Sequence, residues 1–517
     1  MLTLIGRLFE ELNARGIRYC HWKSNTGLDG ALQGIGDLDL LVDPMDWSTF
    51  EAVLKELGFV KAAPSSWQTS AETHQHYFGM DGRTGRLAHV DACDRVVTGG
   101  TLLKNHDLPL RDMIFESLSY TGIVPVPGRA QELVALVLRK IIESASPLEH
   151  AYLLRELREV RAELQALADG ETRPKALELV VRRLPCLEPS LFERCFAALA
   201  SGSLVQRWLV GCQLARMLRP YQLRRSGAAE AFRCFAFARR LLARLGWGEQ
   251  GVAVSPRGAL VAFIGPEGSG KSTLVAETGR WLAQALRVRT IHAGKPPVSF
   301  ITAFTRPFLP LLRAVAPRYR TTMFDAKRSP TSESKRGLGF YLYALRCVAL
   351  AYDRAKLLRT AERKRRSGAI VLCDRYPLHG TLPDGVQLDE RKLARQGNHR
   401  GRAMARMERA LYSRVPTPDA VIACQVSLEL ALQRNLTRSK RGGPEPESLV
   451  RLRHSQFSNA SLELEAYRVH TDRPLPETLS TVRRLVWDCI ARHQNALPLP
   501  HPGQDVARSI PIVKGPM

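Results

Sequence analysis

The sequence predicts an α/β protein: a parallel sheet with helices on both faces in the C-terminal half, an α+β domain at the N-terminus and a helical region between them. Three observations support this fold class. A glycine-rich turn, GPEGSGKST at residues 265–273, follows the apolar run 259–264 and precedes the helix-compatible stretch 274–286. Further along, short apolar runs alternate with longer helical patterns, which is typical of parallel strands joined by helices. Near the N-terminus, Asp37 and Asp39 alternate with apolar residues as side chains on one face of a strand do.

The length of the chain indicates its domain organisation. Its 517 residues exceed the size at which one hydrophobic core keeps growing, and 45% of them are hydrophobic, so we expect about two or three folded domains. The predicted division is an α+β domain at 1–126, a helical region at 127–246, a linker at 247–257, a phosphate-loop domain at 258–495 and a disordered, proline-rich tail at 496–517.

Cysteine usage and the apolar runs favour a reducing, cytoplasmic location. The ten cysteines form no C-x-x-C pair, and Glu10 and Glu11 interrupt the opening apolar stretch that would otherwise suggest a signal peptide. The most apolar helical stretch, 341–352, contains Arg346 and is too short to cross a bilayer. We therefore expect free thiols and no transmembrane segment.

A formal net charge of +25 and a pI near 10 indicate a polyanionic partner. The excess lies mainly in residues 216–244, 354–366 and 391–406, and none of these segments resembles a nucleic-acid-binding module. Nucleotide phosphates are the first expectation, an anionic membrane surface the second and nucleic acid the last.

The first strand after an N-terminal helix is predicted at 37–42. Asp37 and Asp39 alternate with apolar residues, so their carboxylates share one face of this strand. Held that close, they favour a divalent cation between them. The run 87–91 ends in Asp91 and is expected to form a neighbouring strand. The three carboxylates together predict a metal site.

Three carboxylates on adjacent strands after a short polar turn, here Lys23-Ser24-Asn25, resemble the catalytic core of the nucleotidyltransferase superfamily. The resemblance covers about residues 1–145. It implies that Asp37, Asp39 and Asp91 hold magnesium ions that activate the attacking group and steady the leaving pyrophosphate. The superfamily's usual Gly-Ser turn is replaced in this chain, so a degenerate, non-catalytic domain is the alternative.

Apolar residues at helical spacing predict helices in the middle region at 133–142, 152–167 and 192–218. The segment 231–245 combines three phenylalanines with four arginines. Such a stretch either lies on an anionic membrane surface or packs on its own protein as a connector helix. The glycines and the proline of 246–258 then predict a hinge.

The turn at 265–273 matches the phosphate-binding pattern G-x-x-x-x-G-K-[ST] in its required context, with a strand before it and a helix after it. Its three glycines let successive backbone N–H groups turn toward phosphate oxygens. The following helix adds the positive end of its dipole. The ammonium of Lys271 is expected to reach the β- and γ-phosphates, and the hydroxyl of Ser272 to hold magnesium. An incidental glycine-rich turn is the alternative.

Further strands and helices complete the C-terminal domain. We expect strands at 288–291, 369–373, 420–424 and 467–470, and helices at 338–366, 428–441 and 478–493. Ligands gather at the carboxyl ends of parallel strands, and Asp374 follows one of them. We therefore expect Asp374 to complete the magnesium shell and Arg375 to grip a phosphate, with a plain strand-end ion pair as the alternative.

Together these residues resemble the thymidylate kinase branch of the nucleoside monophosphate kinases. The likeness rests on the turn at 265–273, Asp353-Arg354 late in a helix, Asp374-Arg375-Tyr376 at a strand end and Pro418-Asp419 before the next strand. It covers about residues 258–495. Two departures concern the acceptor side: Pro377-Leu378-His379-Gly380 replaces the stretch that reads the base, and Gln425 stands where the family usually carries an aspartate. The basic, proline-rich connection 296–335 has no ready counterpart.

The resemblance implies a role for each site residue. ATP would be held by Gly265, Glu267, Gly268, Ser269, Gly270, Lys271, Ser272, Thr273 and Arg354. Phosphoryl transfer would depend on Lys271, Asp374, Arg375, Arg434 and Arg438, the last two in a lid together with Arg441. Glu267 would meet the acceptor sugar, and Arg354 and Arg375 the acceptor phosphate. These residue types suit the reaction, because phosphoryl transfer needs positioning of negative charge more than covalent help.

The sequence thus predicts an ATP- and magnesium-dependent kinase fused to a nucleotidyltransferase-like domain. Its acceptor would be a nucleoside monophosphate such as dTMP, or a similar phosphate-bearing molecule. The alternative is a nucleotidyltransferase acting on a small molecule or sugar phosphate, as in making precursors of surface polysaccharides, with the phosphate-loop domain as a nucleotide-binding regulatory module.

Overall fold

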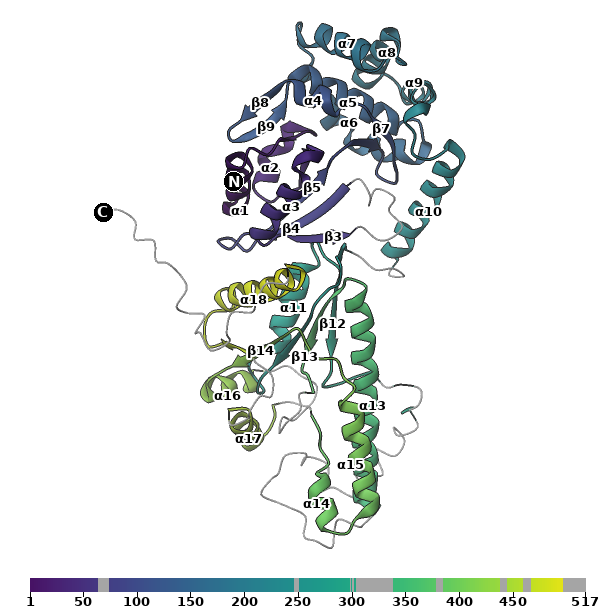
Figure 1. Cartoon of the computed structure of the whole chain (residues 1–517). Helices are drawn as coiled ribbons and strands as arrows, with labels where there is room; N and C mark the ends of the chain where they lie inside the picture. The colour runs from purple at the N-terminus through teal and green to yellow at the C-terminus, as the bar shows by residue number, and fades with distance from the viewer. Residues whose placement is uncertain are drawn as a thin grey trace, which may run out of the picture. The chain divides into compact units, whose positions relative to one another are not determined.

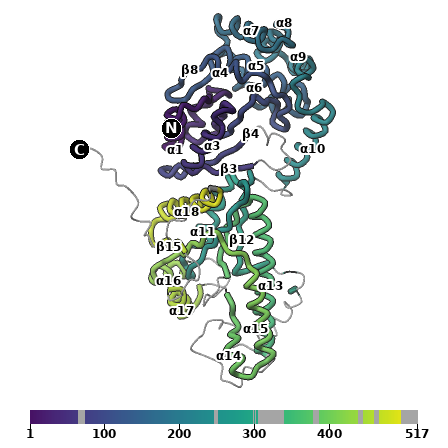
Figure 2. The backbone as a smooth tube through the Cα atoms, viewed as in Figure 1, coloured from purple at the N-terminus to yellow at the C-terminus, as the bar shows by residue number. Residues whose placement is uncertain are grey.

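The computed structural model describes residues 1–63, 74–245, 251–297, 299, 302–303, 338–377, 385–437, 444–458 and 466–495. The chain divides into two compact units, Met1–Ser255 and Pro256–Met517 (Figure 1). Each unit is built around its own main sheet, and the break between them falls in the teal part of the chain in Figure 2. No described helix is both long and apolar enough to span a bilayer.

The first unit contains a mixed sheet in the order β1-β2-β5-β4-β3-β10. Its strands are β1 (Tyr19–His21), β2 (Asp37–Val42), β3 (Val60–Ala63), β4 (His74–Met80), β5 (Leu87–Cys93) and β10 (Ala253–Val254). β2 and β5 are parallel, and the other neighbours are antiparallel. Because β10 pairs with β3, part of the predicted linker at 247–257 belongs to this sheet.

Helices cover both faces of the first sheet. α1 (Thr3–Ala14), α2 (Leu28–Leu32) and α3 (Trp47–Glu56) share one apolar cluster with Leu38 and Val90. The other cluster joins Cys20 and Cys93 of the strands to the helical region. The α+β domain and the helices predicted after it therefore share one core.

The helical region runs from α5 to α10. Its helices are α5 (Arg129–Glu143), α6 (Pro147–Leu167), α7 (Thr172–Arg183), α8 (Pro189–Ala200), α9 (Leu204–Met217) and α10 (Ser226–Arg244). The single helix predicted at 192–218 is wrong, because the chain turns at Gly202, where an added Cβ would lie 2.5 Å from the carbonyl oxygen of Ala198. Ser203 and Gln206 then cap α9 reciprocally. Smaller elements complete the unit: β6 (Val96–Gly99), β7 (Lys104–Leu108), α4 (Arg111–Glu116), β8 (Leu118–Thr121) and β9 (Val124–Pro127).

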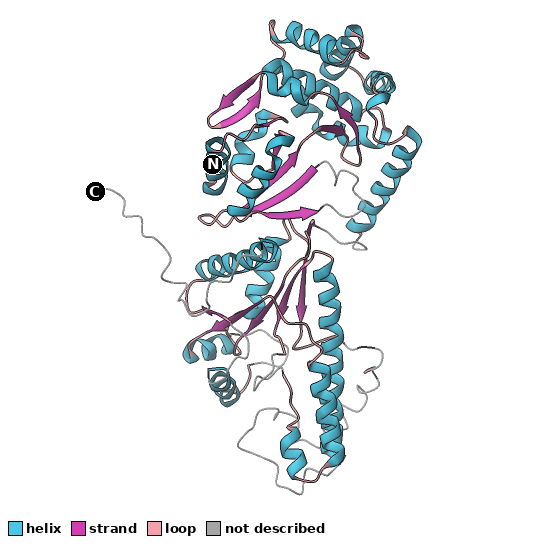
Figure 3. Cartoon of the chain, viewed as in Figure 1, coloured by secondary structure: helices cyan, strands magenta, loops and turns pink. Residues whose placement is uncertain are grey.

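The second unit confirms the predicted parallel sheet, in the order β12-β13-β11-β14-β15. Its strands are β11 (Leu260–Ile264), β12 (Val288–His292), β13 (Ile370–Asp374), β14 (Ala420–Gln425) and β15 (Tyr467–His470). Every residue of β11 and β13 is buried, as expected for central strands with helices on both faces. Figure 3 shows these strands in magenta between cyan helices.

Two sets of helices enclose this sheet. α11 (Lys271–Leu282) and α18 (Leu475–Asn495) meet through Trp281 and Trp487, whose ring centroids lie 6.2 Å apart. α13 (Leu338–Arg366) contributes Leu358 to a separate apolar cluster with Leu260 and Ala262. The remaining helices are α14 (Glu390–Arg395), α15 (His399–Tyr412), α16 (Leu428–Leu436) and α17 (Glu447–Ser458). α16 ends earlier than the helix predicted at 428–441, and residues 438–443 and the tail at 496–517 lie outside the described ranges.

Candidate active site

The topology of the parallel sheet predicts a ligand crevice where β11 and β14 lie side by side. From β11 the chain crosses through α11 toward β12, on one side of the sheet. From β14 it passes through α16 and α17 to β15, on the other side. Adjacent strands whose connections diverge leave a ligand crevice outside their carboxyl ends. The glycine-rich loop leaves β11 at this point.

Close packing explains why the loop is rich in glycine. A Cβ on Gly265 would lie 2.5 Å from the carbonyl oxygen of Cys424, at the end of β14. Gly268 has a φ of 78°, and a Cβ there would lie 2.9 Å from the carbonyl oxygen of Ala431 in α16. Side chains at either position would push the loop away from β14 and α16. The strand, loop and helix predicted around this motif are confirmed as β11, 265–270 and α11.

Lys271 lies inside the loop, at the first position of α11. Its Nζ donates hydrogen bonds to the carbonyl oxygen of Pro266 (2.6 Å) and to Oγ of Ser269 (3.1 Å). Burial lowers the pKa of Lys271, and the nearby Arg375 lowers it further. A phosphate oxygen in the loop would offer this ammonium a stronger, charge-assisted acceptor than a backbone carbonyl.

Ser272 and Asp374 meet beside the loop. Oγ of Ser272 donates to Oδ2 of Asp374 at 2.5 Å, because β11 and β13 are neighbours and bring the start of α11 to the end of β13. Oδ1 of Asp374 is buried and has no hydrogen-bond partner among the described residues. A hydroxyl beside a carboxylate with an oxygen to spare is a donor set that suits magnesium. These two residues therefore fit the ion that the sequence predicts.

Glu267 is held between two arginines next to the loop. Arg375 pairs with its Oε1, and Nη1 of Arg453, in α17, lies 3.5 Å from the same oxygen. Arg375 has a φ of 68°, a left-handed conformation that costs a residue with a side chain about 1–2 kcal/mol. Backbone strain of this kind clusters at functional sites. The pair with Glu267 joins Arg375 to the loop, and the plain strand-end ion pair of Asp374-Arg375 stays the alternative prediction.

Two other predicted site arginines hold the protein's own backbone. Nη1 of Arg434 donates to the carbonyl oxygen of Gly268 (3.2 Å), and Nη2 to that of Thr471 (2.8 Å). Nε of Arg354 donates to the carbonyl oxygen of Ala293 (2.9 Å), and Nη1 to the hydroxyl of Tyr412 (2.9 Å). Their roles in transfer and in acceptor binding remain predictions.

The remaining predicted site residues divide between loop, helix and undescribed chain. Ser269 is fully buried, Gly270 caps α11 in a left-handed conformation, and Thr273 is exposed in its first turn. Arg438, Arg441, His379 and Gly380 lie outside the described residues.

Two residues near the site were missed in the sequence. Arg453 has no motif around it, and only folding brings α17 to Glu267. Nε2 of His292, at the end of β12, lies 4.0 Å from Oδ2 of Asp374. The signal for His292 was its place after a predicted strand, because polar residues at the carboxyl ends of parallel strands meet at one edge.

In the first unit, the predicted carboxylates are paired with basic side chains. Asp39 lies opposite Asp91 in the β2–β5 register, and Asp37 opposite His89. Nζ of Lys23 contacts Asp39 and lies 3.5 Å from Oδ2 of Asp91.

Asp91 also has Nζ of Lys104 at 3.7 Å and Nδ1 of His74 at 2.9 Å. Burial alone would raise the pKa of Asp91, but Lys23, Lys104 and His74 hold it well below its ordinary value. Burial alone would lower the pKa of Lys23, but Asp39 and Asp91 raise it.

This arrangement does not suit the magnesium ion predicted for Asp37, Asp39 and Asp91. The described residues contain no group of three histidine, cysteine, aspartate or glutamate side chains placed to hold a metal. The Lys23 ammonium lies where an ion bridging Asp39 and Asp91 would have to sit, and Asp37 turns to Nδ1 of His89.

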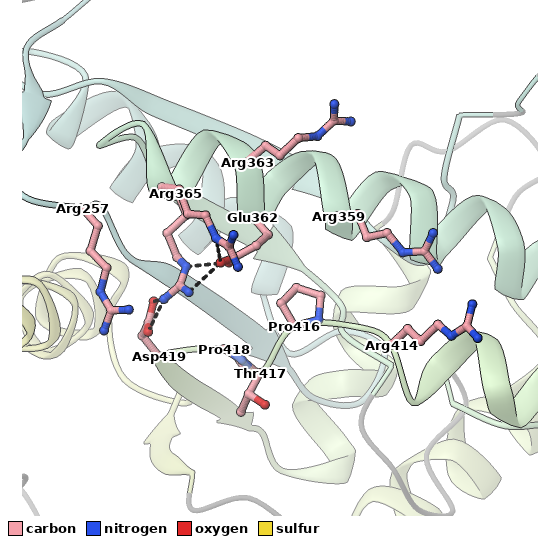
Figure 4. A pocket seen from close by; sticks show the side chains of 11 residues that line it. Arg257, Arg359, Glu362, Arg363, Arg365, Arg414, Pro416, Thr417, Pro418 and Asp419 are labelled. Atoms are coloured by element: carbon pink, nitrogen blue, oxygen red, sulfur yellow. Dashed lines mark hydrogen bonds and ion pairs between the residues drawn. The ribbon is translucent and has the colours of Figure 1, made fainter.

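A basic pocket lies near the amino ends of β11 and β14 (Figure 4). Its volume is about 850 Å³, and its arginines are Arg257, Arg359, Arg363, Arg365, Arg366 and Arg414. Arg365 binds both oxygens of Asp419 (2.7 and 2.9 Å), and Oδ2 of Asp419 accepts from the amide of Leu260 at the start of β11 (2.7 Å). The Pro418-Asp419 feature of the sequence therefore ties α13 to the amino ends of β11 and β14, away from the phosphate loop.

Comparisons with known proteins give structural neighbours only. One is thymidylate kinase from Candida albicans, with 15% identity over 46% of this chain and 93% of that chain and a TM-score of 0.25. Another is deoxyadenosine kinase from M. mycoides with bound dATP, with 16% identity over 44% of this chain and 98% of that chain and a TM-score of 0.26. No protein-family model matches the chain, and no curated protein matches it. Similarity this weak does not identify a substrate.

Proposed function

We propose that the second unit is an ATP- and magnesium-dependent kinase, and that its acceptor is a phosphate-bearing small molecule, with a nucleoside monophosphate such as dTMP as the first expectation. The observation that carries the proposal is the Ser272–Asp374 pair beside the glycine-rich loop. Buried polar atoms normally have a hydrogen-bond partner. Oδ1 of Asp374 beside the loop, which has no such partner within the described part of the chain, is therefore explained by a ligand site and not by a simple turn.

Each residue of the loop has a part in this proposal. Backbone N–H groups and the N-terminus of α11 bind the β- and γ-phosphates. Lys271 exchanges the Pro266 carbonyl for a γ-phosphate oxygen. Magnesium, when bound by Ser272 and Asp374, neutralises charge on the phosphates.

Arg375 is the residue placed to meet the acceptor. It is 26% exposed in its side chain and paired with Glu267, so an acceptor phosphate can replace that carboxylate. An oxygen of the acceptor phosphate attacks the γ-phosphorus, the bond to the β–γ bridging oxygen breaks, and ADP leaves. Glu267, released from Arg375, then accepts a hydrogen bond from a sugar hydroxyl.

The test is acceptor-dependent ADP formation. The full chain is incubated with ATP, magnesium and a panel of nucleoside and sugar monophosphates. We expect ADP only with a subset of acceptors, and none above background with Lys271→Ala. ATP binding without acceptor-dependent ADP across the panel would reject the kinase and leave the nucleotide-binding regulatory role.

The first unit is not assigned a metal-dependent reaction. Its carboxylates are already paired with Lys23 and Lys104, which favours the degenerate, non-catalytic alternative over a working nucleotidyltransferase. All ten cysteines are free, which supports the proposed reducing, cytoplasmic location.

A further inference from the structure

Helix α10 is attached to the first unit by a stripe of small and charged residues. Ala229 and Ala236 are its buried residues, and Arg233 and Arg240 follow the same stripe at positions i+4 and i+11 from Ala229. Nη2 of Arg240 donates to the carbonyl oxygen of Thr101 (2.9 Å), and Nε of Arg233 lies 3.8 Å from Oε1 of Glu149. The side of α10 that faces its unit is therefore largely polar.

The opposite side of α10 is apolar and exposed. Its members are Ala231, Cys234, Phe235, Phe237, Ala238, Leu241, Leu242 and Leu245. At about 100° per residue, they fill an arc of about 160°. Its one charged residue is Glu230 near the start of the helix, and Glu230 is paired with Arg233. Phe235 is 51% exposed, Leu241 50% and Leu245 65%. A surface helix of a globular protein normally points such a face at the core, so this one is available to a partner.

The charges around this face favour an anionic partner. Arg239 borders the arc on one side and Arg244 on the other, and the guanidinium of Arg239 lies 5.9 Å from the ring centroid of Phe235. Residues 204–245 hold nine arginines and one acidic residue, whereas residues 1–203 hold 22 Lys and Arg against 27 Asp and Glu. The positive charge of the first unit is therefore concentrated at α9 and α10.

The same charges disfavour a second copy of the chain as the occupant of this face. A second copy of the chain would bring the same arginines against each other. Residues 256–517 also carry a net positive charge, with 44 Lys and Arg against 21 Asp and Glu, so neither unit of a second copy has a charge that favours this face. A lipid surface with anionic headgroups satisfies both requirements, since it accepts apolar side chains and binds arginines.

We propose that α10 docks the protein on an anionic lipid bilayer. The helix lies in the plane of the headgroups, with its leucines and phenylalanines in the acyl boundary and Arg239 and Arg244 on lipid phosphates. This goes beyond the kinase proposal, because it places the protein at a membrane surface whatever its acceptor is.

Vesicle sedimentation of the full chain tests this directly. We expect sedimentation with vesicles of phosphatidylcholine plus phosphatidylglycerol, little with phosphatidylcholine alone, and weakening by salt. The double variant Leu241→Glu/Leu242→Glu should bind at least about tenfold more weakly. Leu154→Glu/Val181→Glu is the matched control, because these residues of α6 and α7 are also exposed (42% and 53%). Equal binding by both double variants, or no preference for the anionic lipid, would overturn the proposal.

Cys234 offers a second readout that does not depend on a charge change. It is the one exposed cysteine of the ten and lies on the apolar face. A polarity-sensitive dye on Cys234 should shift to the blue when anionic vesicles are added. An unreactive thiol, a dye already in an apolar environment without vesicles, or a concentration-dependent dimer that Leu241→Glu/Leu242→Glu abolishes would assign the face to protein and overturn the proposal.

Discussion

Lys271 makes nucleotide binding depend on pH in a defined direction. Burial and Arg375 lower its pKa in the protein, and a bound phosphate raises it again by stabilising the ammonium. Binding is then strongest below the lowered pKa of the free protein and weakens as the pH rises through it. Calorimetric titration with MgATP from neutral to alkaline pH should show this loss, and Lys271→Met should bind weakly with a flat profile. A wild-type affinity that rises with pH would contradict the assignment.

Arg375 and Arg453 share Glu267 but differ in their expected importance. Only Arg375 also lies at the end of β13, next to Asp374, so we expect Arg375→Ala to lower kcat/KM for the acceptor about 100-fold. Arg453→Ala is the matched control, because it removes the other cation on Glu267, and it should lower kcat/KM by less than about tenfold. Steady-state kinetics with the best acceptor give both values. Similar losses in the two variants would mean that Arg375 acts only through Glu267.

Lys23 is expected to stabilise the first unit. Asp91 is buried and paired with Lys23 and Lys104, and removing one partner of a buried pair costs about 3–5 kcal/mol. Lys23→Met should lower the free energy of unfolding of the first unit by about 3 kcal/mol in urea titrations. Magnesium should leave the melting temperature of the wild-type first unit unchanged. The concentrations used are those that also leave the melting temperature of the second unit unchanged. Stabilisation by magnesium that Asp39→Asn removes would restore the metal site.

Sequence patterns found the residues of the loop but not their neighbours. The strand, loop and helix around Lys271 follow each other in the chain, so local pattern was enough to place Gly265 to Ser272. Asp374 was found because strand ends share an edge of the sheet. Arg453 was not, because its contact with Glu267 depends on where α17 packs. Lys23 was interpreted as part of a turn, and only its contacts with Asp39 and Asp91 in the folded structure show that it neutralises them.

At the level of elements, the loop packs closely against α16. Adding a side chain to the loop can therefore lower stability in two ways, through the backbone conformation and through a clash with α16. Gly268 and Gly270 have nearly the same φ, 78° and 75°, but only Gly268 has neighbours within 4 Å of an added Cβ. Each Gly→Ala change should cost about 1 kcal/mol for the backbone conformation. Gly268→Ala should cost more, because Ala431 must move. Chemical unfolding of the two variants measures the difference, and equal losses would show that α16 does not constrain the loop.

Helix prediction was reliable where apolar periodicity was long and failed where a local signal was overlooked. α13 was predicted at its observed bounds, because its apolar and basic residues extend without a break. The stretch 192–218 keeps its apolar spacing across Gly202, so the break between α8 and α9 was missed, although Ser203 and Gln206 carry the capping pattern. The direction of the apolar face of α10 could not be predicted, because a periodicity shows that a face exists and not which way it points.

For the molecule as a whole, the two units differ in charge as well as in fold. Almost all of the net charge of +25 belongs to residues 256–517, which suits a unit that handles phosphates. The first unit is near neutral apart from α9 and α10. The sequence predicted a domain boundary near the glycines before residue 258, and the boundary between the two units falls between residues 255 and 256. The sequence did not predict that β10 pairs with the first sheet, because a strand of two residues is too short to show a periodic pattern.

The fate of the γ-phosphate tests the central claim most directly. With γ-labelled ATP, magnesium and the best acceptor, the label should appear on the acceptor phosphate and not as inorganic phosphate. Asp374→Asn should slow this transfer about 100-fold or more, because it weakens the site for magnesium. Label found only in inorganic phosphate, or transfer that proceeds unchanged in Asp374→Asn, would contradict the account of the loop, Ser272 and Asp374 as a phosphoryl-transfer site.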